Sequence, residues 1–199
     1  MQTIDFIFDF ASPNAYLAHQ VMPPIADRHG AKINLIPCLL GGIFKATGNQ
    51  APMIAFGQIK GKMQYEMLEM QRFIKKHKLT RFSMNPHFPV NTLTIMRGLI
   101  VAQSNGDEAR YINAVLPAMW EDGKDMSDPE VIENVLSDAG FDGKALLQNT
   151  REEAVKTKLF GNTNDAVARG AFGVPTFFVG DEMFFGKDRL AQLEDALSA

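Results

Sequence analysis

The sequence is poor in the residues on which redox and metal chemistry depend. Of its 199 residues only one is a cysteine, so no internal disulfide can form and a dithiol redox cycle is excluded. The four histidines show no paired ligand spacing, and we therefore expect no metal site. A chain that uses cysteine so sparingly is typical of a cytoplasmic protein, which is the location we expect.

Charge and hydropathy exclude further classes of protein. The net charge is −3 and the charged fraction is 22%, so we expect no nucleic-acid partner and no disordered tail. No apolar run reaches the roughly 18 residues of a transmembrane helix, and we expect no membrane partner. The N-terminus enters a strand pattern directly, without the features of a signal peptide. Hydrophobic residues, in contrast, make up 46% of the chain, enough for a sizeable core.

The first 36 residues predict a β-α-β unit. Thr3 to Phe8 is short and rich in isoleucine and phenylalanine, as in a buried strand. Ser12 then offers an N-cap hydroxyl, and a helix is expected from Pro13 until Gly30 ends it. Ala31 to Ile36 predicts a second strand, which in such a unit lies parallel to the first.

The middle of the chain is helical in pattern. From about Gly41 to Arg169 we find no convincing strand. Apolar residues recur at helical spacing in five segments, namely Ile54 to Lys76, Asn91 to Gln103, Glu108 to Trp120, Pro129 to Asp138 and Glu152 to Arg169.

Strand character returns only near the C-terminus. Thr176 to Val179 and Met183 to Phe185 predict a hairpin around Gly180-Asp181, and the final helix carries three leucines on one face. The order β-α-β, helical block, β-β-α predicts an α/β fold of thioredoxin-like type with a large all-helical insertion. We expect residues 1–40 and 170–199 to form the thioredoxin-like domain and residues 41–169 the inserted domain.

Short motifs, in one order along the chain, carry a family resemblance. They are Asp9-Phe10-Ala11-Ser12-Pro13, Leu39-Leu40-Gly41-Gly42-Ile43-Phe44, Gly48-Asn49, Ala171-Phe172-Gly173-Val174-Pro175-Thr176 and Phe184-Phe185-Gly186-Lys187-Asp188-Arg189. Together with the order of strands and helices, they resemble 2-hydroxychromene-2-carboxylate isomerases and kappa-class glutathione transferases. Both groups belong to the DsbA-like branch of thioredoxin folds, and the resemblance covers essentially the whole chain.

The resemblance implies glutathione as cofactor, a small aromatic substrate and a homodimer. For the isomerases it implies interconversion of 2-hydroxychromene-2-carboxylate and trans-o-hydroxybenzylidenepyruvate in naphthalene-type catabolism. A thiolate suits this cis/trans change, because it can add to the conjugated double bond, permit rotation and leave again. Thioredoxin-type redox proteins place their attacking cysteine where this chain has Ser12, so the thiol is expected to come from glutathione.

Ser12 is the expected catalytic residue. Its hydroxyl can donate a hydrogen bond to the glutathione sulfur, and the N-terminus of the helix that follows adds its dipole. Each contribution is worth about 1 kcal/mol, or roughly one pKa unit of the thiol. The alternative for Ser12, taken alone, is a plain N-cap.

The remaining glutathione contacts are carried over from the resemblance. A cis Val174-Pro175 bond would expose the Val174 backbone to an extended tripeptide; the alternative is a trans proline at the start of a strand. Gly186-Lys187-Asp188 is expected to start the last helix. Backbone N–H groups there can hold a carboxylate, and Asp188 can accept from an amino group, although it can equally favour the helix start. The expected contacts are Ser12, Pro13, Asn49, Lys62, Val174, Pro175, Phe185, Gly186, Lys187 and Asp188. Of these, Lys62 has a solvated surface role as its alternative.

The substrate side departs from the pattern expected of naphthalene-pathway isomerases. Phe44 and Pro86 stand in segments where basic or hydroxyl groups for the substrate carboxylate would be expected, and Lys45 is one position along. We assign Phe44, Lys45, Asn85 and Pro86 to the substrate side. The alternatives to an isomerase are a kappa-class-like transferase that conjugates small electrophiles, and a non-catalytic thioredoxin-fold binding module.

Three further features are expected to be structural. Cys38 follows a strand and is expected to be buried and inert. Trp120 is expected in the core. Met63, Met67 and Met70 lie at helical spacing and are expected to line the core or a cleft.

Overall fold

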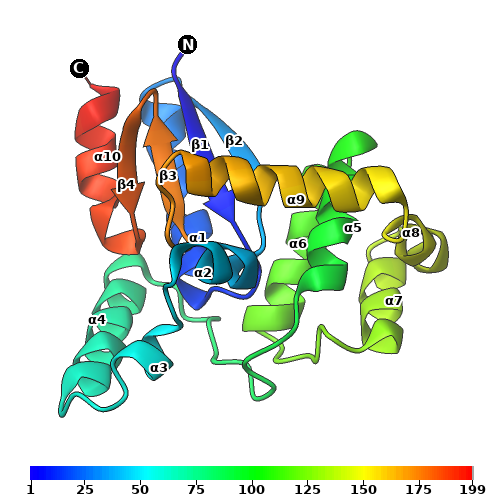
Figure 1. The fold of residues 1–199 in the computed structure, drawn as a ribbon, viewed down its shortest axis with the longest axis horizontal. Helices are drawn as coiled ribbons and strands as arrows, with labels where there is room; N and C mark the ends of the chain where they lie inside the picture. Colours follow the sequence, from blue (N-terminus) through cyan, green and yellow to red (C-terminus); the bar gives the residue numbers. More distant parts are fainter. Residues whose placement is uncertain (199) are drawn as a thin grey trace.

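A four-stranded sheet forms the base of the fold. The computed structural model describes residues 1–198. The strand order is β2-β1-β3-β4 (Figure 1), with β1 and β2 parallel and the other pairs antiparallel. The strands are β1 (Thr3–Phe8), β2 (Lys32–Pro37), β3 (Thr176–Val179) and β4 (Glu182–Phe185). The predicted thioredoxin-like α/β fold is confirmed.

Central strand β1 is apolar because both of its faces are covered. Ile4, Phe6, Ile7 and Phe8 are all buried. Phe6 meets Phe177 of β3 with ring centroids 4.6 Å apart. Helix α1 (Pro13–Arg28) packs against β2 and against α10 (Leu190–Leu197), which in turn covers β3 and β4. The three leucines predicted for one face of the last helix are buried.

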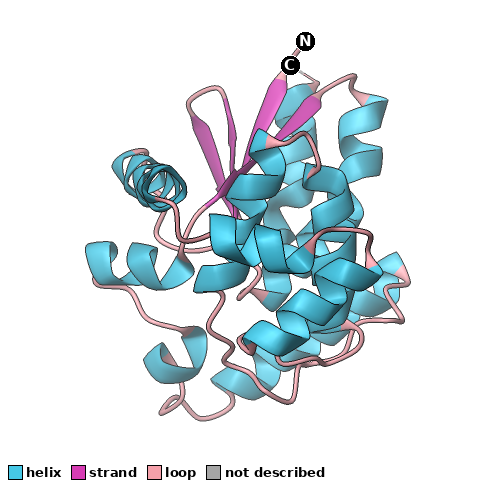
Figure 2. Ribbon diagram, turned by 90° about the vertical axis from the view of Figure 1, so that its right-hand side faces the viewer, coloured by secondary structure: helices cyan, strands magenta, loops and turns pink. Residues whose placement is uncertain are grey.

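Helices form most of the rest of the molecule (Figure 2). No helix within residues 1–198 is both long and apolar enough to cross a membrane. A 3-10 turn, η1 (Lys187–Arg189), precedes α10. Between β2 and β3 lie α2 (Leu40–Thr47), α3 (Pro52–Ala55), α4 (Lys62–His77), α5 (Leu93–Ser104), α6 (Glu108–Trp120), α7 (Pro129–Asp138), α8 (Gly143–Asn149) and α9 (Glu153–Ala168). The division into two domains with a boundary at residues 40 and 170 stays a prediction.

The single helix predicted from Ile54 to Lys76 is wrong. The chain turns between α3 and α4, where Gly61 adopts φ 82°, a conformation that favours glycine. A side chain at Gly57 would place its Cβ 2.4 Å from the carbonyl oxygen of Met53, so this turn also depends on a bare backbone. Apolar residues continue through the turn, which is why periodicity alone missed the break.

Helices α2 and α8 were not predicted as separate elements. Glycines at their starts obscure both. The first residue of α8 is Gly143, and no larger residue fits there, because a Cβ would lie 2.5 Å from the carbonyl oxygen of Glu133 on α7. Close packing of two helices, and not a loop, explains this glycine.

The predictions of buried residues are confirmed for Cys38 and Trp120 but not for all the methionines of α4. Cys38 and Trp120 are fully buried, as expected. The prediction for the methionines of α4 is wrong at Met67, which is 59% exposed. No residue of α4 is buried.

Candidate active site

Ser12 is the N-cap of α1, in the turn that follows β1. Its hydroxyl accepts from the Ala15 N–H at 3.2 Å and donates to the Val174 carbonyl oxygen at 3.0 Å. The side chain is held in the interior, since Ser12 is only 5% exposed. The N-cap role is therefore confirmed, and the same hydroxyl also joins the turn to the segment before Pro175.

The Val174-Pro175 peptide bond is cis, the first of the two alternatives that the sequence left open. Pro175 also fixes the start of η1, because its carbonyl oxygen accepts from the Gly186 N–H at 2.9 Å. Two hydrogen bonds thus connect Ser12, the Val174-Pro175 segment and Gly186. Lys187 and Asp188 follow directly, so the structure brings together residues that lie far apart in the sequence.

Lys187 has a buried side chain that is 5% exposed. Its ammonium nitrogen lies 3.0 and 3.1 Å from the two carboxylate oxygens of Asp188. It also lies 5.5 Å from the centre of the Phe73 ring on α4. The Asp188 carboxylate remains exposed to solvent. The predicted direct start of the last helix at Gly186 is corrected, because the short turn η1 comes first.

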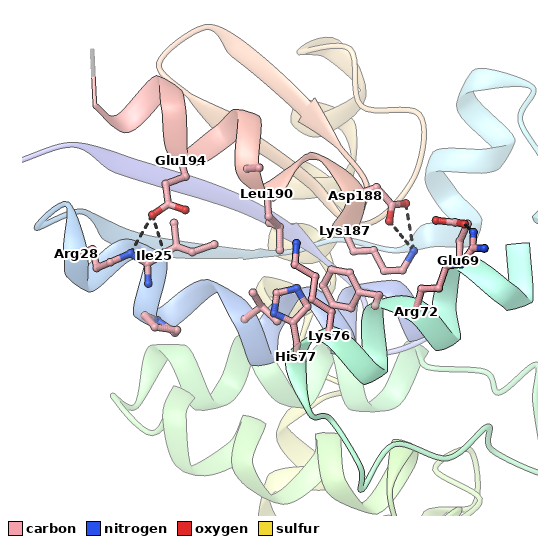
Figure 3. A pocket seen from close by; sticks show the side chains of 14 residues that line it. Ile25, Arg28, Glu69, Arg72, Lys76, His77, Lys187, Asp188, Leu190 and Glu194 are labelled. Carbon is pink, nitrogen blue, oxygen red and sulfur yellow. Dashed lines mark hydrogen bonds and ion pairs between the residues drawn. The ribbon is translucent and has the colours of Figure 1, made fainter.

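A cleft of about 480 Å³ extends from Lys187 and Asp188 between α1, α4 and α10 (Figure 3). At this end it also contains the ion pair of Glu69 and Arg72 on α4. Val21, Pro24, Ile25, Phe73, Leu190 and Ala191 supply its apolar surface. At the far end, Arg28 of α1 pairs with Glu194 of α10.

Glu69 and Arg72 were not identified from the sequence as residues of the site. Their separation of three residues on a helix predicts an ion pair, but no local signal shows that α4 lies beside η1. The Arg72 hydrogen bond lowers the pKa of the Glu69 carboxyl, and the Lys187 charge lowers it further. Two carboxylates and two cations therefore meet at one end of the cleft.

Asn49 and Phe185 lie along the segment that precedes Pro175. The Asn49 amide donates to the Phe172 carbonyl oxygen at 2.7 Å, which ties the chain after α2 to this segment. Phe185 is exposed on β4, and its ring centre lies 4.4 Å from that of Phe172.

Lys62 has contacts of a different kind. Its ammonium pairs with Glu66 one turn along α4 and lies 5.4 Å from the Phe56 ring centre. These contacts stay within the α3–α4 region and fit the alternative of a surface lysine. Its glutathione role stays a prediction.

The predicted substrate residues lie on two segments. Phe44 is half-buried and Lys45 exposed, both on α2. Asn85 is buried, and its amide donates to the carbonyl oxygens of Met119 and Lys124, each at 2.8 Å, while its oxygen accepts from the His87 N–H. These bonds leave the amide no free donor for a substrate. Pro86 is exposed on the same loop.

The chain's own thiol is buried and held in its protonated form. Burial raises the pKa of Cys38 to about 12, with a further rise from the charge of Asp9. Its Sγ donates to the Asn162 carbonyl oxygen at 3.3 Å. A thiolate at Ser12 must therefore come from another molecule.

Comparisons with known proteins agree over nearly the whole chain. A family model described as a DSBA-like thioredoxin domain matches residues 3–198. A 2-hydroxychromene-2-carboxylate isomerase of Pseudomonas putida is 32% identical over 197 residues, covering 98% of this chain and 93% of its own length. Glutathione S-transferase kappa 1 of Rattus norvegicus is 27% identical, covering 96% and 89%.

Solved structures show the same relationships. A 2-hydroxychromene-2-carboxylate isomerase superposes with a TM-score of 0.83 at 30% identity, covering 98% of this chain and 94% of the other. DsbA of Pseudomonas aeruginosa superposes with a TM-score of 0.60 at 17% identity, covering 99% and 82%, which shows a shared fold alone.

Proposed function

Since this chain belongs to the DSBA-like thioredoxin domain family, we propose that it is a glutathione-dependent isomerase. The proposed reaction interconverts 2-hydroxychromene-2-carboxylate and trans-o-hydroxybenzylidenepyruvate. Relatives named for the first of these compounds match 98% of the chain at 30–32% identity. The observation that carries the proposal is the Ser12 hydroxyl, held at a helix N-terminus and 3.0 Å from the Val174 carbonyl oxygen.

Ser12 activates the thiol by changing one hydrogen-bond partner. A hydroxyl has one proton, so donation to a thiolate requires release of the Val174 carbonyl oxygen. That oxygen then becomes free to accept from a backbone N–H of glutathione. Throughout, the hydroxyl oxygen still accepts from the Ala15 N–H, which keeps the side chain in place.

The charged end of glutathione matches the end of the cleft. An extended tripeptide spans about 10 Å, and Gly186 is bonded directly to Pro175, so the γ-glutamyl group can reach Lys187 and Asp188. That group carries one ammonium and one carboxylate. The exposed Asp188 carboxylate suits the ammonium, and Lys187 with Arg72 suits the carboxylate.

The reaction needs no net consumption of glutathione. The thiolate adds to the carbon conjugated with the ketone, and the displaced electron pair forms an enolate. Rotation about the new single bond follows; the enolate then re-forms the double bond and expels the thiolate. From the cis isomer, the phenol oxygen closes onto the ketone to give the chromene.

The test is an absorbance assay on trans-o-hydroxybenzylidenepyruvate with and without glutathione. We expect glutathione-dependent turnover in the wild type and about a tenfold or greater loss of kcat in Ser12→Ala, because the thiolate loses its hydrogen bond. Ser127→Ala, a surface serine, is the matched control. Turnover without glutathione, or an unaffected Ser12→Ala, contradicts the proposal.

The second candidate is a glutathione transferase, favoured by kappa-class relatives that match 96–98% of the chain at 25–27% identity. The same thiolate would then stay bonded to the electrophile. Product analysis separates the two, since a transferase consumes glutathione and an isomerase regenerates it. Absence of glutathione binding would favour a non-catalytic binding module. A homodimer and a cytoplasmic location stay predictions, and size-exclusion chromatography with light scattering tests the first.

A further inference from the structure

Asp9 is a buried carboxylate whose partners are all neutral. It follows β1 directly and is 1% exposed. Its Oδ1 accepts from the Ala11 N–H at 2.9 Å and from the Thr92 hydroxyl at 2.7 Å, and its Oδ2 accepts from the Leu40 N–H at 2.7 Å. Burial raises the pKa of this carboxyl, and the three hydrogen bonds oppose the rise. A buried acid without a cation is costly, so its presence requires an explanation.

The three donors belong to three different segments. Ala11 lies in the turn that carries Ser12, whose own N–H donates to the Asp9 carbonyl oxygen at 3.2 Å. Leu40 is the first residue of α2, the helix of Phe44 and Lys45. Thr92 directly precedes α5, at the end of the segment that begins with Asn85 and Pro86.

An ionised carboxylate meets these demands better than any other side chain. It only accepts hydrogen bonds, and here two oxygens serve three donors. It also caps α2, because its Oδ2 accepts from the Leu40 N–H in the first turn of that helix. Leu39, the N-cap residue, has no side-chain oxygen that could do so. An asparagine of the same shape would turn an NH₂ group toward an N–H or an O–H donor.

We propose that Asp9 is a positioning residue for the reaction. It sets the turn that holds the Ser12 hydroxyl relative to the starts of α2 and α5, and so fixes the thiolate relative to the bound substrate. This inference rests on the proposed function. It does not require Asp9 to touch glutathione or substrate.

The test compares Asp9→Asn with two variants of its partner, Thr92→Val and Thr92→Ser. A displacement of about 1 Å can cost about 100-fold in rate, and we expect a loss of that order in kcat for Asp9→Asn. Thr92→Val keeps the shape but removes one donor, and we expect about a tenfold loss. Thr92→Ser restores the donor and should stay within about twofold of the wild type.

Two readouts separate positioning from a merely structural role. Glutathione affinity should change by less than about threefold, because Val174, Lys187 and Asp188 are untouched. The substrate KM should shift in folded Asp9→Asn, whereas partial unfolding would lower kcat in proportion to the active fraction and leave KM unchanged. Circular dichroism measures that fraction. Asp5→Asn is the control, since Asp5 is a half-exposed carboxylate of β1 paired with Arg169.

The possible outcomes are distinct. Folded Asp9→Asn with wild-type kcat and KM, or equal rates for Thr92→Val and Thr92→Ser, would overturn the inference alone. If Asp9→Asn does not fold, the Thr92 pair decides. A wild type without glutathione-dependent turnover would overturn the proposed function and this inference with it.

Discussion

The turn of residues 9–12 and the α3–α4 region are held in opposite ways. In the turn, the Phe10 N–H donates to the Met96 sulfur at 3.5 Å, and the Phe10 carbonyl oxygen accepts from the Trp120 indole N–H at 2.9 Å. Helices α5 and α6 thus fix the backbone beside Ser12. In contrast, α3 and α4 contain no buried residue, and Ile54 and Met67 are 67% and 59% exposed.

The difference follows the chemistry that each region would perform. Activation of a thiolate would depend on the position of the Ser12 hydroxyl, and contacts with helices distant in the sequence hold the turn that carries it. The proposed recognition of the charged end of glutathione would instead use Arg72 of α4, an exposed side chain that can adjust on a less constrained helix. Three measurements can break or sharpen this comparison.

The largest effect is expected at Trp120. Trp120→Ala removes a fully buried side chain and should lower the free energy of unfolding by about 3–5 kcal/mol. Met67→Ala on α4 should change it by less than about 0.5 kcal/mol. Urea denaturation measures both values. Trp120→Phe retains most of the volume but leaves the Phe10 carbonyl oxygen unpaired, and an intermediate loss is expected. Equal losses for Trp120→Ala and Met67→Ala would contradict the comparison.

A second effect concerns pH and His19 on α1. Burial lowers the pKa of His19 to about 4. Between that value and its unfolded pKa of about 6.5, the unfolded chain binds a proton that the folded protein does not, so stability falls as the pH falls. The full loss by pH 4 is up to about 3 kcal/mol.

Two variants isolate this effect. His19→Leu should flatten the dependence of the unfolding free energy on pH between about 6.5 and 4. His77 on α4 also has a lowered pKa, from partial burial and the charge of Lys76, but its substitution by leucine should change the pH dependence little because the ring is partly solvated. Urea titrations at several pH values measure both variants, and an unchanged slope in His19→Leu would rule out this histidine as the cause.

The smallest effect on stability is expected in the third measurement, which counts the reactive thiols of the wild type and of Met67→Cys. Native protein should not react with an aromatic disulfide reagent, because Cys38 is buried and its pKa is raised to about 12. Met67→Cys should add one thiol that reacts at once, with little effect on stability. In urea that variant should show two. Rapid reaction of Cys38 in the native wild type would show that the interior beside the turn opens readily.

The sequence predicted the elements whose signals are local. β1, α6, α7 and β3 begin and end at the predicted residues, since strand composition, N-caps and glycine or proline breaks lie within each segment. The break between α3 and α4 was missed because apolar spacing continues across it. In the site, Ser12 and Val174-Pro175 were identified through motifs.

Other features depend on contacts that no local pattern contains. Asp9 meets Leu40 and Thr92, which are 31 and 83 residues away. The pairing of the Asn85 amide with two carbonyl oxygens depends on where α6 ends. Glu69 and Arg72 belong to the cleft only because α4 packs beside η1.

The hydrogen bond between Ser12 and Val174 spans 162 residues, and this separation has a consequence for biosynthesis. Strands β1 and β2 can pair as soon as they leave the ribosome, but β1 then presents an apolar edge until β3 is made. Pairing over so long a separation is slow, because the chain loses the entropy of loop closure before the contacts between β1 and β3 can stabilise it. The serine would thus be in place early, while its partner arrives among the last segments to be synthesised. Before that moment the nascent protein has neither site nor complete sheet, and its unpaired β1 edge is prone to aggregation.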